Sequence, residues 1–313
     1  MSTPANKRRR QTAVEQFVSC SLSVNTQRAY AADLRRFEAW GGRIPTSAEQ
    51  LARYLAAHAK TLRVATLKRQ LAAIAHAHDR LALPCPSRTP LVRNTLRGIR
   101  RKHGAQQKQA KALTTGALSK LVTATPHFSA LQNSRDRALL LLGFAGGFRR
   151  SELCALLVGD LNFTKAGVLV RLRQGKTDQF ASGRDVAIPG AANSKLCPVA
   201  ALRKWLQLVK RRFTAVANEL PLFGSIDRYG NIRPGLNAAT VGVILRRRME
   251  AKGLDPRGFS AHSLRAGLVT SAAQAGVPVW AIQRQTGHKS AASATKYIRE
   301  VDAFRCNAAQ AVL

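Results

Sequence analysis

Helical periodicity runs through most of this 313-residue chain, and one stretch near its middle interrupts it. There, Val168, Val170 and Leu172 alternate with other side chains, and the segment RDVAIP follows after a turn rich in glycine and serine. Alternation with a period of two is typical of β-strands, whereas apolar residues three and four positions apart are typical of helices. The pattern therefore predicts a mainly α fold that carries a small antiparallel β-sheet.

The first hundred residues show helical spacing of apolar residues in four segments, 25–42, 46–60, 64–83 and 89–103. Asn25 or Thr26 is the predicted N-cap of the first helix. Helical patterns resume at about 114–124 and 134–146, and again from Pro198 onward.

The segment 104–114 is polar, basic and weakly periodic, which is typical of an interdomain linker. We therefore predict an N-terminal helical domain over residues 1–106 and a second domain over residues 107–313.

Positive charge is spread over the whole chain, with 51 Lys and Arg against 16 Asp and Glu and a formal net charge of +35. Residues 1–108 hold 21 basic and 5 acidic residues, and the remainder holds 30 and 11. Such a charge favours a polyanionic partner, and the planar fork of arginine suits phosphate. DNA or RNA is favoured over a membrane, because no apolar run reaches the roughly 18 residues of a spanning helix.

The five cysteines are scattered and include no C-x-x-C pair, so neither a disulfide framework nor a zinc site is predicted. The N-terminus MSTPANKRRR lacks the apolar segment of a secretory signal. We expect a cytoplasmic, nucleoid-associated protein whose KRRR run is a basic arm lying on phosphates.

Three short segments place cationic side chains where they could bind a phosphate. GFRRSEL puts Arg149 three residues before Glu152, close enough for the carboxylate to orient a guanidinium or a backbone group. RLRQGKTDQF puts Lys176 in the turn between the two predicted strands, and HSLRAG puts His262 and Arg265 on one helix face. Solvated helix faces and an exposed loop lysine are the ordinary alternatives.

A fourth segment, QTGHKSAASATKYIRE, places His288 ahead of Tyr297. Alone, such a tyrosine is usually packing or surface. Together with the other segments it fits phosphoryl transfer, because arginine forks can neutralise phosphate oxygens and a histidine can help to accept the tyrosine proton. The product would be a covalent phosphotyrosine. No carboxylate cluster for Mg²⁺ and no phosphate-binding Gly-x-x-x-x-Gly-Lys loop occur, so no cofactor is expected.

In this order the four segments resemble the boxes of the tyrosine recombinases, the phage-integrase family. The resemblance covers essentially the whole chain and implies a helical, SAM-like core-binding domain followed by an α+β catalytic domain, together a C-shaped DNA clamp. The closest likeness is to Cre-type recombinases, through NTQRAYAADLRRFEAW, AGVPVWAIQRQTGH and KYIRE. One departure is His288, since Cre has tryptophan at that position.

The resemblance also implies a role for each site residue. Arg149 and Arg265 would bind the scissile phosphate of a specific site in double-stranded DNA, with Glu152 as the supporting acid. Tyr297 would attack to leave a 3′-phosphotyrosine, and Lys176 would protonate the 5′-oxygen. His262 would assist as acid and base, and His288 would hydrogen-bond the phosphate.

By the same resemblance, a homotetramer on two DNA sites would exchange strands through a Holliday junction without metal or ATP. The last helix, roughly residues 303–313, would dock on a neighbouring subunit, although packing within its own subunit explains its apolar residues equally well. Small residues at 290–295 would let Tyr297 swing into line with the phosphate.

Candidate DNA contacts outside the catalytic set are basic residues on three predicted helices: Arg28, Lys68, Arg69, Arg246, Arg247 and Arg248. Solvated helix faces are the alternative for them. If they bind phosphates, affinity for DNA depends steeply on salt.

Two other functions stay open at this point. One is a type IB topoisomerase-like DNA relaxase, which would use the same chemistry without synapsis. The other is a non-catalytic DNA-binding accessory protein of the same fold, against which the complete set of six catalytic positions argues.

Overall fold

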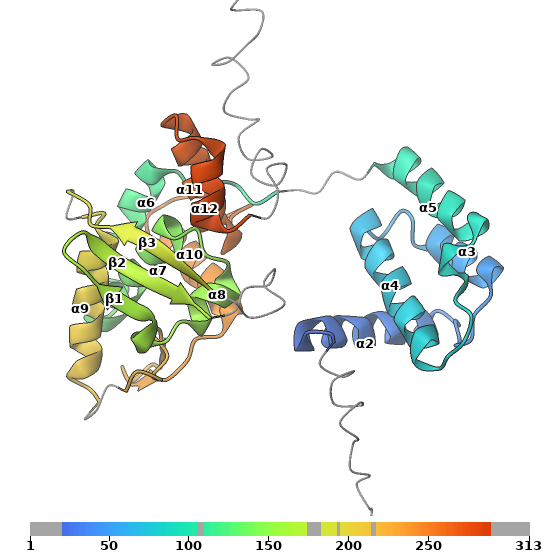
Figure 1. The fold of residues 1–313 in the computed structure, drawn as a ribbon, viewed down its shortest axis with the longest axis horizontal. Coiled ribbons are helices and arrows are strands. Elements are labelled where there is room, and N and C mark those ends of the chain that lie inside the picture. The colour runs from blue at the N-terminus through green and yellow to red at the C-terminus, as the bar shows by residue number, and fades with distance from the viewer. Residues whose placement is uncertain (1–20, 105–108, 174–182, 193–194, 214–216, 289–313) are drawn as a thin grey trace, which may run out of the picture. The chain divides into compact units, whose positions relative to one another are not determined.

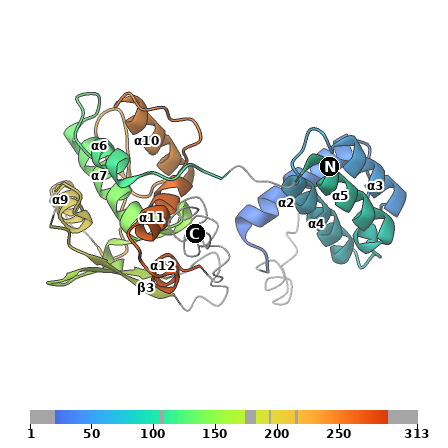
Figure 2. The same ribbon diagram turned by 90° about the horizontal axis from the view of Figure 1, so that it is seen from above.

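A computed structural model of the chain describes residues 21–104, 109–173, 183–192, 195–213 and 217–288. The chain divides into two compact units, residues 1–108 and 109–313 (Figures 1 and 2). Lys176, Tyr297, the segment 290–295 and the predicted terminal helix at 303–313 lie outside the described residues. Within the described part, none of the helices has the length and apolarity that a membrane span requires.

The first unit packs its helices around one apolar core (Figure 1). Its helices are α2 (Val24–Ala39), α3 (Ala48–Ala57), α4 (Val64–Arg80) and α5 (Pro90–His103), with the 3-10 turn η1 (Pro86–Arg88) before α5. Helix α2 packs on α4, and α3 packs on α5. Phe37, Leu51 and Tyr54 are fully buried between them, as helical spacing of apolar residues requires.

Two helix ends in this unit differ from the predictions. Ser23, and not Asn25 or Thr26, caps α2, because its hydroxyl accepts the backbone N–H of Thr26 at 3.3 Å. Helix α4 ends at Arg80, before Ala82 adopts a left-handed φ of 52°. Ser, Asn and Thr are all favoured N-caps, so their order in the sequence does not decide which one begins the helix.

The second unit is mainly helical and carries a three-stranded antiparallel sheet in the order β1-β2-β3. Its first half contains α6 (Thr115–Leu121), α7 (Ala130–Ala145), α8 (Arg150–Ala155), η2 (Val158–Asp160), β1 (Leu161–Phe163), β2 (Gly167–Leu172) and β3 (Arg184–Pro189). Its second half contains α9 (Pro198–Lys210), β4 (Ser225–Ile226), β5 (Ile232–Arg233), α10 (Ala238–Glu250), α11 (His262–Gln274) and α12 (Val279–Thr286). The mainly α fold with a small antiparallel sheet is confirmed.

The sheet buries one face, as its alternating sequence predicts. Val168 pairs with Ile188 and Val170 with Val186, and all four side chains are buried. The intervening Leu169 and Arg171 are exposed. Figure 2 shows helices α7 and α9 on the same side of the sheet, and α7 also packs against α9 and α11. Strand β1 was not predicted, because three residues are too few to show alternation.

The backbone just after the linker is fixed to the start of α11. The N–H of Lys111 donates to Gly258 O, and that of Leu113 donates to Ser263 O, both at 3.0 Å. A side chain on Gly267 would place its Cβ 2.2 Å from Leu113 O, so only glycine permits this close approach. This contact holds the helix end that carries His262.

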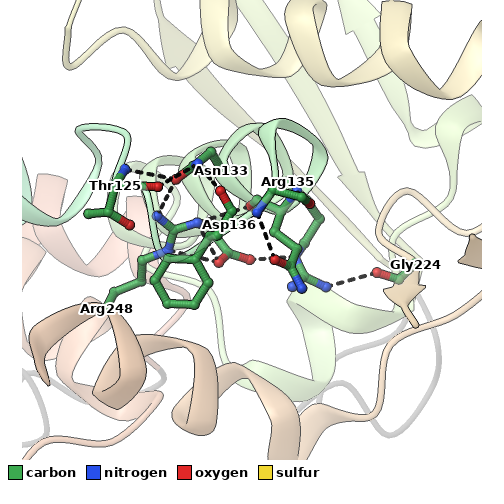
Figure 3. A network of polar contacts seen from close by, with 9 residues as sticks. Thr125, Asn133, Arg135, Asp136, Gly224 and Arg248 are labelled. Carbon is green, nitrogen blue, oxygen red and sulfur yellow. Dashed lines mark hydrogen bonds and ion pairs between the residues drawn. The ribbon is translucent and has the colours of Figure 1, made fainter. Parts of the chain in front are cut away.

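A buried ionic network joins α7, α10 and the loop before β4 (Figure 3). Asp136 accepts hydrogen bonds from Arg135 Nε at 2.5 Å and from Arg248 Nε at 2.8 Å. Arg248 also donates to Asn133 Oδ1 at 2.6 Å, and Arg135 donates to Gly224 O at 3.0 Å. Arg248 is only 1% exposed, so the prediction that it contacts DNA phosphates is wrong: it binds Asp136 inside the domain.

Candidate active site

Arg149 lies at the N-cap of α8, two residues after Gly147 in the glycine turn that ends helix α7. Glu152, 4% exposed, accepts the backbone N–H of Arg149 on Oε2 at 2.9 Å and the guanidinium Nη1 on Oε1. One carboxylate therefore caps the helix and orients the arginine side chain, the two tasks that the sequence left as alternatives. The turn needs Gly147, whose φ is 57° and whose Cβ would lie 2.8 Å from Thr286 Cγ2.

Arg265 projects from the first turn of α11 and is 1% exposed. Its Nη1 donates to Gly147 O and to Thr286 O, each at 2.7 Å. Its Nε donates to His288 Nε2 at 3.3 Å. These bonds fix the guanidinium between the turn before Arg149 and the end of α12, which brings three distant segments together.

His288 follows the C-terminal end of α12, where Gly287 adopts the left-handed conformation that commonly ends a helix. Its Nδ1 lies 2.7 Å from the hydroxyl oxygen of Thr286, and its Nε2 faces Arg265. The imidazole is thus held on both sides by side chains that come from α11 and α12.

Arg184, at the start of β3, ties the sheet to the segment that precedes His288. Its guanidinium donates to the carbonyl oxygens of Gln285 at 3.0 Å and Thr286 at 3.2 Å. Gln285 strengthens this junction, because its amide donates to Ala145 O at 2.9 Å and to Ala187 O at 3.2 Å. Strand β3, which pairs with β2, is therefore anchored beside His288.

The site has a strongly positive electrostatic environment. Desolvation, then the charges of Arg265 and Arg149, lowers the pKa of His262. Desolvation also lowers the pKa of His288 to about 4, and Arg265, Arg149, His262 and Arg184 add to the effect. Both imidazoles are therefore neutral at pH 7 without DNA. A group of arginines that depresses nearby histidine pKa values in this way is suited to bind an anion.

Cys154 lies on α8 two residues after Glu152, and its thiol is not activated. Burial raises its pKa to about 11, so it is protonated at neutral pH. Among the described residues, no group of three His, Cys, Asp or Glu side chains could hold a metal ion.

The structure thus gathers Arg149, Glu152, Arg265 and His288, with His262 at the exposed N-terminal end of the helix that carries Arg265. Sequence reasoning missed Arg184, Thr286 and Gln285. The arginine could have been noticed as a charged residue at the start of a strand next to the lysine turn. Nothing in the sequence marks Thr286, because its role depends on which side chains meet in space.

The other predicted DNA contacts have different surroundings. Arg28, Lys68, Arg246 and Arg247 are exposed. Arg69 is half-exposed and forms a two-point ion pair with the buried Asp33, at 2.7 and 2.9 Å, which joins α4 to α2. Its first role is therefore structural, whereas the four exposed cations are available to phosphates.

Comparisons with known proteins agree with this fold. The family model described as "Phage integrase family" matches residues 111–303. An integrase/recombinase xerD homolog from Selenomonas ruminantium is 34% identical over 297 residues, which cover 92% of this chain and 85% of that protein.

Solved structures share the fold at low identity. A XerH site-specific recombinase bound to a palindromic difH substrate is 18% identical with a TM-score of 0.65, over 94% of this chain and 85% of that one. A lambda integrase tetramer bound to a Holliday junction is 18% identical with a TM-score of 0.61, over 90% of this chain and 74% of that one.

The fold and the arginine–histidine site define an enzyme of the tyrosine recombinase class, which cleaves and religates DNA. The chain belongs to the phage integrase family. These relatives are Xer-type and lambda-type proteins, so the specific likeness to Cre-type recombinases stays a prediction.

Proposed function

We propose that this recombinase cleaves one strand of a specific double-stranded DNA site by attack of Tyr297 on the scissile phosphate. The observation that carries the proposal is the convergence of Arg149, Arg265 and His288 from separate segments on one positively charged site. Lys176 and Tyr297 lie outside the described residues, and their roles rest on their places in the sequence motifs.

In this mechanism the two arginines bind the non-bridging oxygens of the phosphate, where charge develops in the transition state. Each is already oriented, Arg149 by Glu152 and Arg265 by the carbonyls of Gly147 and Thr286. Preorganised donors of this kind need no rearrangement during the reaction, which is why they accelerate it.

Proton transfer falls to the remaining groups. Neutral His262 can take up the proton that the Tyr297 hydroxyl loses, because desolvation and then the charges of Arg265 and Arg149 hold its pKa low. Lys176 gives a proton to the leaving 5′-oxygen. The phosphodiester energy is kept in the 3′-phosphotyrosine, so religation to a partner strand requires no ATP.

We also propose that strand exchange proceeds through a Holliday junction within a homotetramer on two DNA sites. The lambda integrase of the comparison forms a tetramer on such a junction. Both units of the chain carry excess positive charge, which supports a clamp that contacts DNA from both. A DNA substrate of this kind would place the protein in the cytoplasm with the nucleoid.

A suicide DNA substrate, nicked so that the cleaved product cannot religate, tests the proposal directly. The wild-type chain should form a covalent adduct that migrates more slowly in a denaturing gel, and Tyr297→Phe should bind the site without forming it. Adduct formation by Tyr297→Phe would show that another residue attacks. A wild-type protein that binds its site but never forms adduct would be an accessory protein.

The same preparation separates recombination from relaxation. Incubation with supercoiled plasmid that lacks the site should leave the plasmid supercoiled, whereas a plasmid with two sites should yield recombined products. Relaxation of the site-free plasmid by a monomer would favour the topoisomerase-like function instead.

A further inference from the structure

Thr286 takes part in several of the contacts that hold the candidate site together. Its side chain is fully buried at the last residue of α12. Its carbonyl oxygen accepts from Arg265 and from Arg184, and its methyl group faces the position where Gly147 allows a close approach. The hydroxyl makes two further hydrogen bonds, and these determine the chemistry of the neighbouring imidazole.

The direction of both hydroxyl bonds follows from donor and acceptor chemistry. The Thr286 hydroxyl lies 2.7 Å from the carbonyl oxygen of Ile282, which cannot donate, so the only hydroxyl proton points there. The same oxygen lies 2.7 Å from His288 Nδ1 and must accept in that contact. His288 therefore carries a proton on Nδ1.

The other ring nitrogen of His288, Nε2, is unprotonated. Arg265 Nε always carries its proton and lies 3.3 Å from His288 Nε2, so Nε2 accepts in this contact. The ring is thus neutral, with Nδ1 protonated and the lone pair of Nε2 directed at the arginine that binds phosphate.

We propose that Thr286 is a positioning residue that holds the proton of His288 on Nδ1, so that Nε2 is the nitrogen that gains a proton and donates to the bound phosphate. The inference rests on the proposed function, because it assigns the atom of His288 that meets the DNA. A ring with its proton on Nε2 and no partner for Nδ1 would instead gain its second proton on the side away from the phosphate.

The surrounding charges make this uptake depend on DNA. Burial disfavours a positive charge on the ring, and the nearby Arg265, Arg149, His262 and Arg184 add to this effect. A phosphate bound between the arginines offsets that repulsion, so one proton moves from solvent to Nε2 when DNA binds. The imidazolium then donates from Nδ1 to Thr286 and from Nε2 to a phosphate oxygen.

A pair of substitutions separates the hydroxyl from the methyl group. Thr286→Val keeps the shape of the side chain and removes the hydroxyl. Thr286→Ser keeps the hydroxyl and removes the methyl that packs near Gly147. A role in packing alone predicts that the serine variant is the impaired one, and a role for the hydroxyl predicts the reverse.

The first measurement is the ¹⁵N NMR signature of the His288 ring in the DNA-free protein, assigned by comparison with His288→Gln. In wild type and Thr286→Ser, Nδ1 should show the protonated signature and Nε2 the unprotonated one. In Thr286→Val, the Nδ1 signature should move toward the unprotonated form. An unchanged tautomer in the valine variant would overturn the proposal.

The second measurement is the rate of adduct formation on the suicide substrate as a function of pH. The rate of adduct formation by Thr286→Val should fall roughly tenfold or more, the usual effect of removing a hydrogen bond to a charged group, and the alkaline limb of its pH profile should move to lower pH. Thr286→Ser should keep the wild-type pH profile. A valine variant with the wild-type rate and profile would refute the role, whereas absence of adduct from wild type would refute only the proposed function, because the tautomer measurement needs no activity.

Discussion

At the scale of single residues, the site depends on side chains that each satisfy two partners. Glu152 divides its two oxygens between the backbone N–H and the guanidinium of Arg149. Arg265 donates to two carbonyls and to His288. Hydrogen bonds to two or more partners restrict each group to one orientation before DNA binds. The free energy needed to organise the site for the transition state is therefore lower.

Glu152→Gln tests this orientation with little change in volume. The amide can still accept the Arg149 N–H through its oxygen, but its NH₂ then faces the guanidinium as a second donor. We expect adduct formation on the suicide substrate to slow by roughly tenfold or more. The control is Glu250→Gln, an exposed glutamate at the end of α10, which should react at the wild-type rate; equal rates for both variants would contradict the orienting role.

The depressed pKa of His288 has a consequence for stability. Its folded-state pKa of about 4 lies below the usual value of 6.5. Between these two values the unfolded chain binds a proton that the folded site does not, so the free energy of unfolding of the DNA-free protein should fall as the pH drops through this window.

Denaturant unfolding at about pH 7 and about pH 5 measures this effect, since most of the proton uptake by an unfolded histidine lies between them. His288→Gln removes the titrating group and keeps a polar side chain, so it should lose less stability than wild type over the same change. Parallel losses in the two proteins would show that other groups account for the pH dependence.

At the scale of elements, buried ion pairs and glycine turns set how helices meet. Asp136 on α7 is the carboxylate between Arg135 and Arg248, which links α7 to α10 (Figure 3). Asp33 and Arg69 make the corresponding tie between α2 and α4 in the first unit. In the sequence these charged residues are indistinguishable from surface charges, but in the structure their ion pairs join helices.

Asp136→Ala would leave two buried guanidinium groups without their carboxylate. We expect a loss of about 3–5 kcal/mol in the free energy of unfolding, because breaking a buried pair leaves uncompensated charge. Chemical denaturation measures it. The matched control is Asp255→Ala, which removes an exposed pair with Arg257 and should cost no more than about 1 kcal/mol.

Gly147→Ala tests the turn before Arg149. Alanine at a φ of 57° is strained, and its Cβ would meet Thr286 Cγ2 at 2.8 Å. A loss of about 1–3 kcal/mol in stability is expected from the backbone conformation, accompanied by slower adduct formation. Gly98→Ala on α5 is the control, since a Cβ there meets nothing within 4 Å. Similar behaviour of the two variants would argue against a constrained turn.

At the scale of the whole molecule, charge decides how the enzyme finds DNA. A net charge of +35 is shared by both units, and cations such as Lys68 and Arg247 are exposed. Binding should release counterions, so the logarithm of the association constant should fall linearly with the logarithm of salt concentration.

Arg247 and Arg248 are adjacent in sequence and opposite in surroundings, which makes them a matched pair. Arg247→Ala should weaken DNA binding, lower the salt slope by about 1 and leave stability nearly unchanged. Arg248→Ala should chiefly destabilise the domain, because it deprives Asp136 of a buried partner. Salt titrations of DNA binding and denaturation of both variants check this; a reduced salt slope for Arg248→Ala with unchanged stability would contradict its burial.

The sequence by itself determined the class of fold and the basic DNA-binding character, and it predicted the catalytic motifs. Those properties are local: apolar spacing sets helix or strand, net charge follows from composition, and each motif occupies a few consecutive residues.

Only the tertiary structure decided which cations serve the fold and which remain for DNA, and which side chains orient the site. Arg247 and Arg248 have the same sequence signal, yet one faces solvent and the other binds Asp136. Thr286 reaches His288, Arg265 and Arg184 only because α12, α11 and β3 meet at its position. Burial and long-range partners depend on how elements pack, and no local pattern records that.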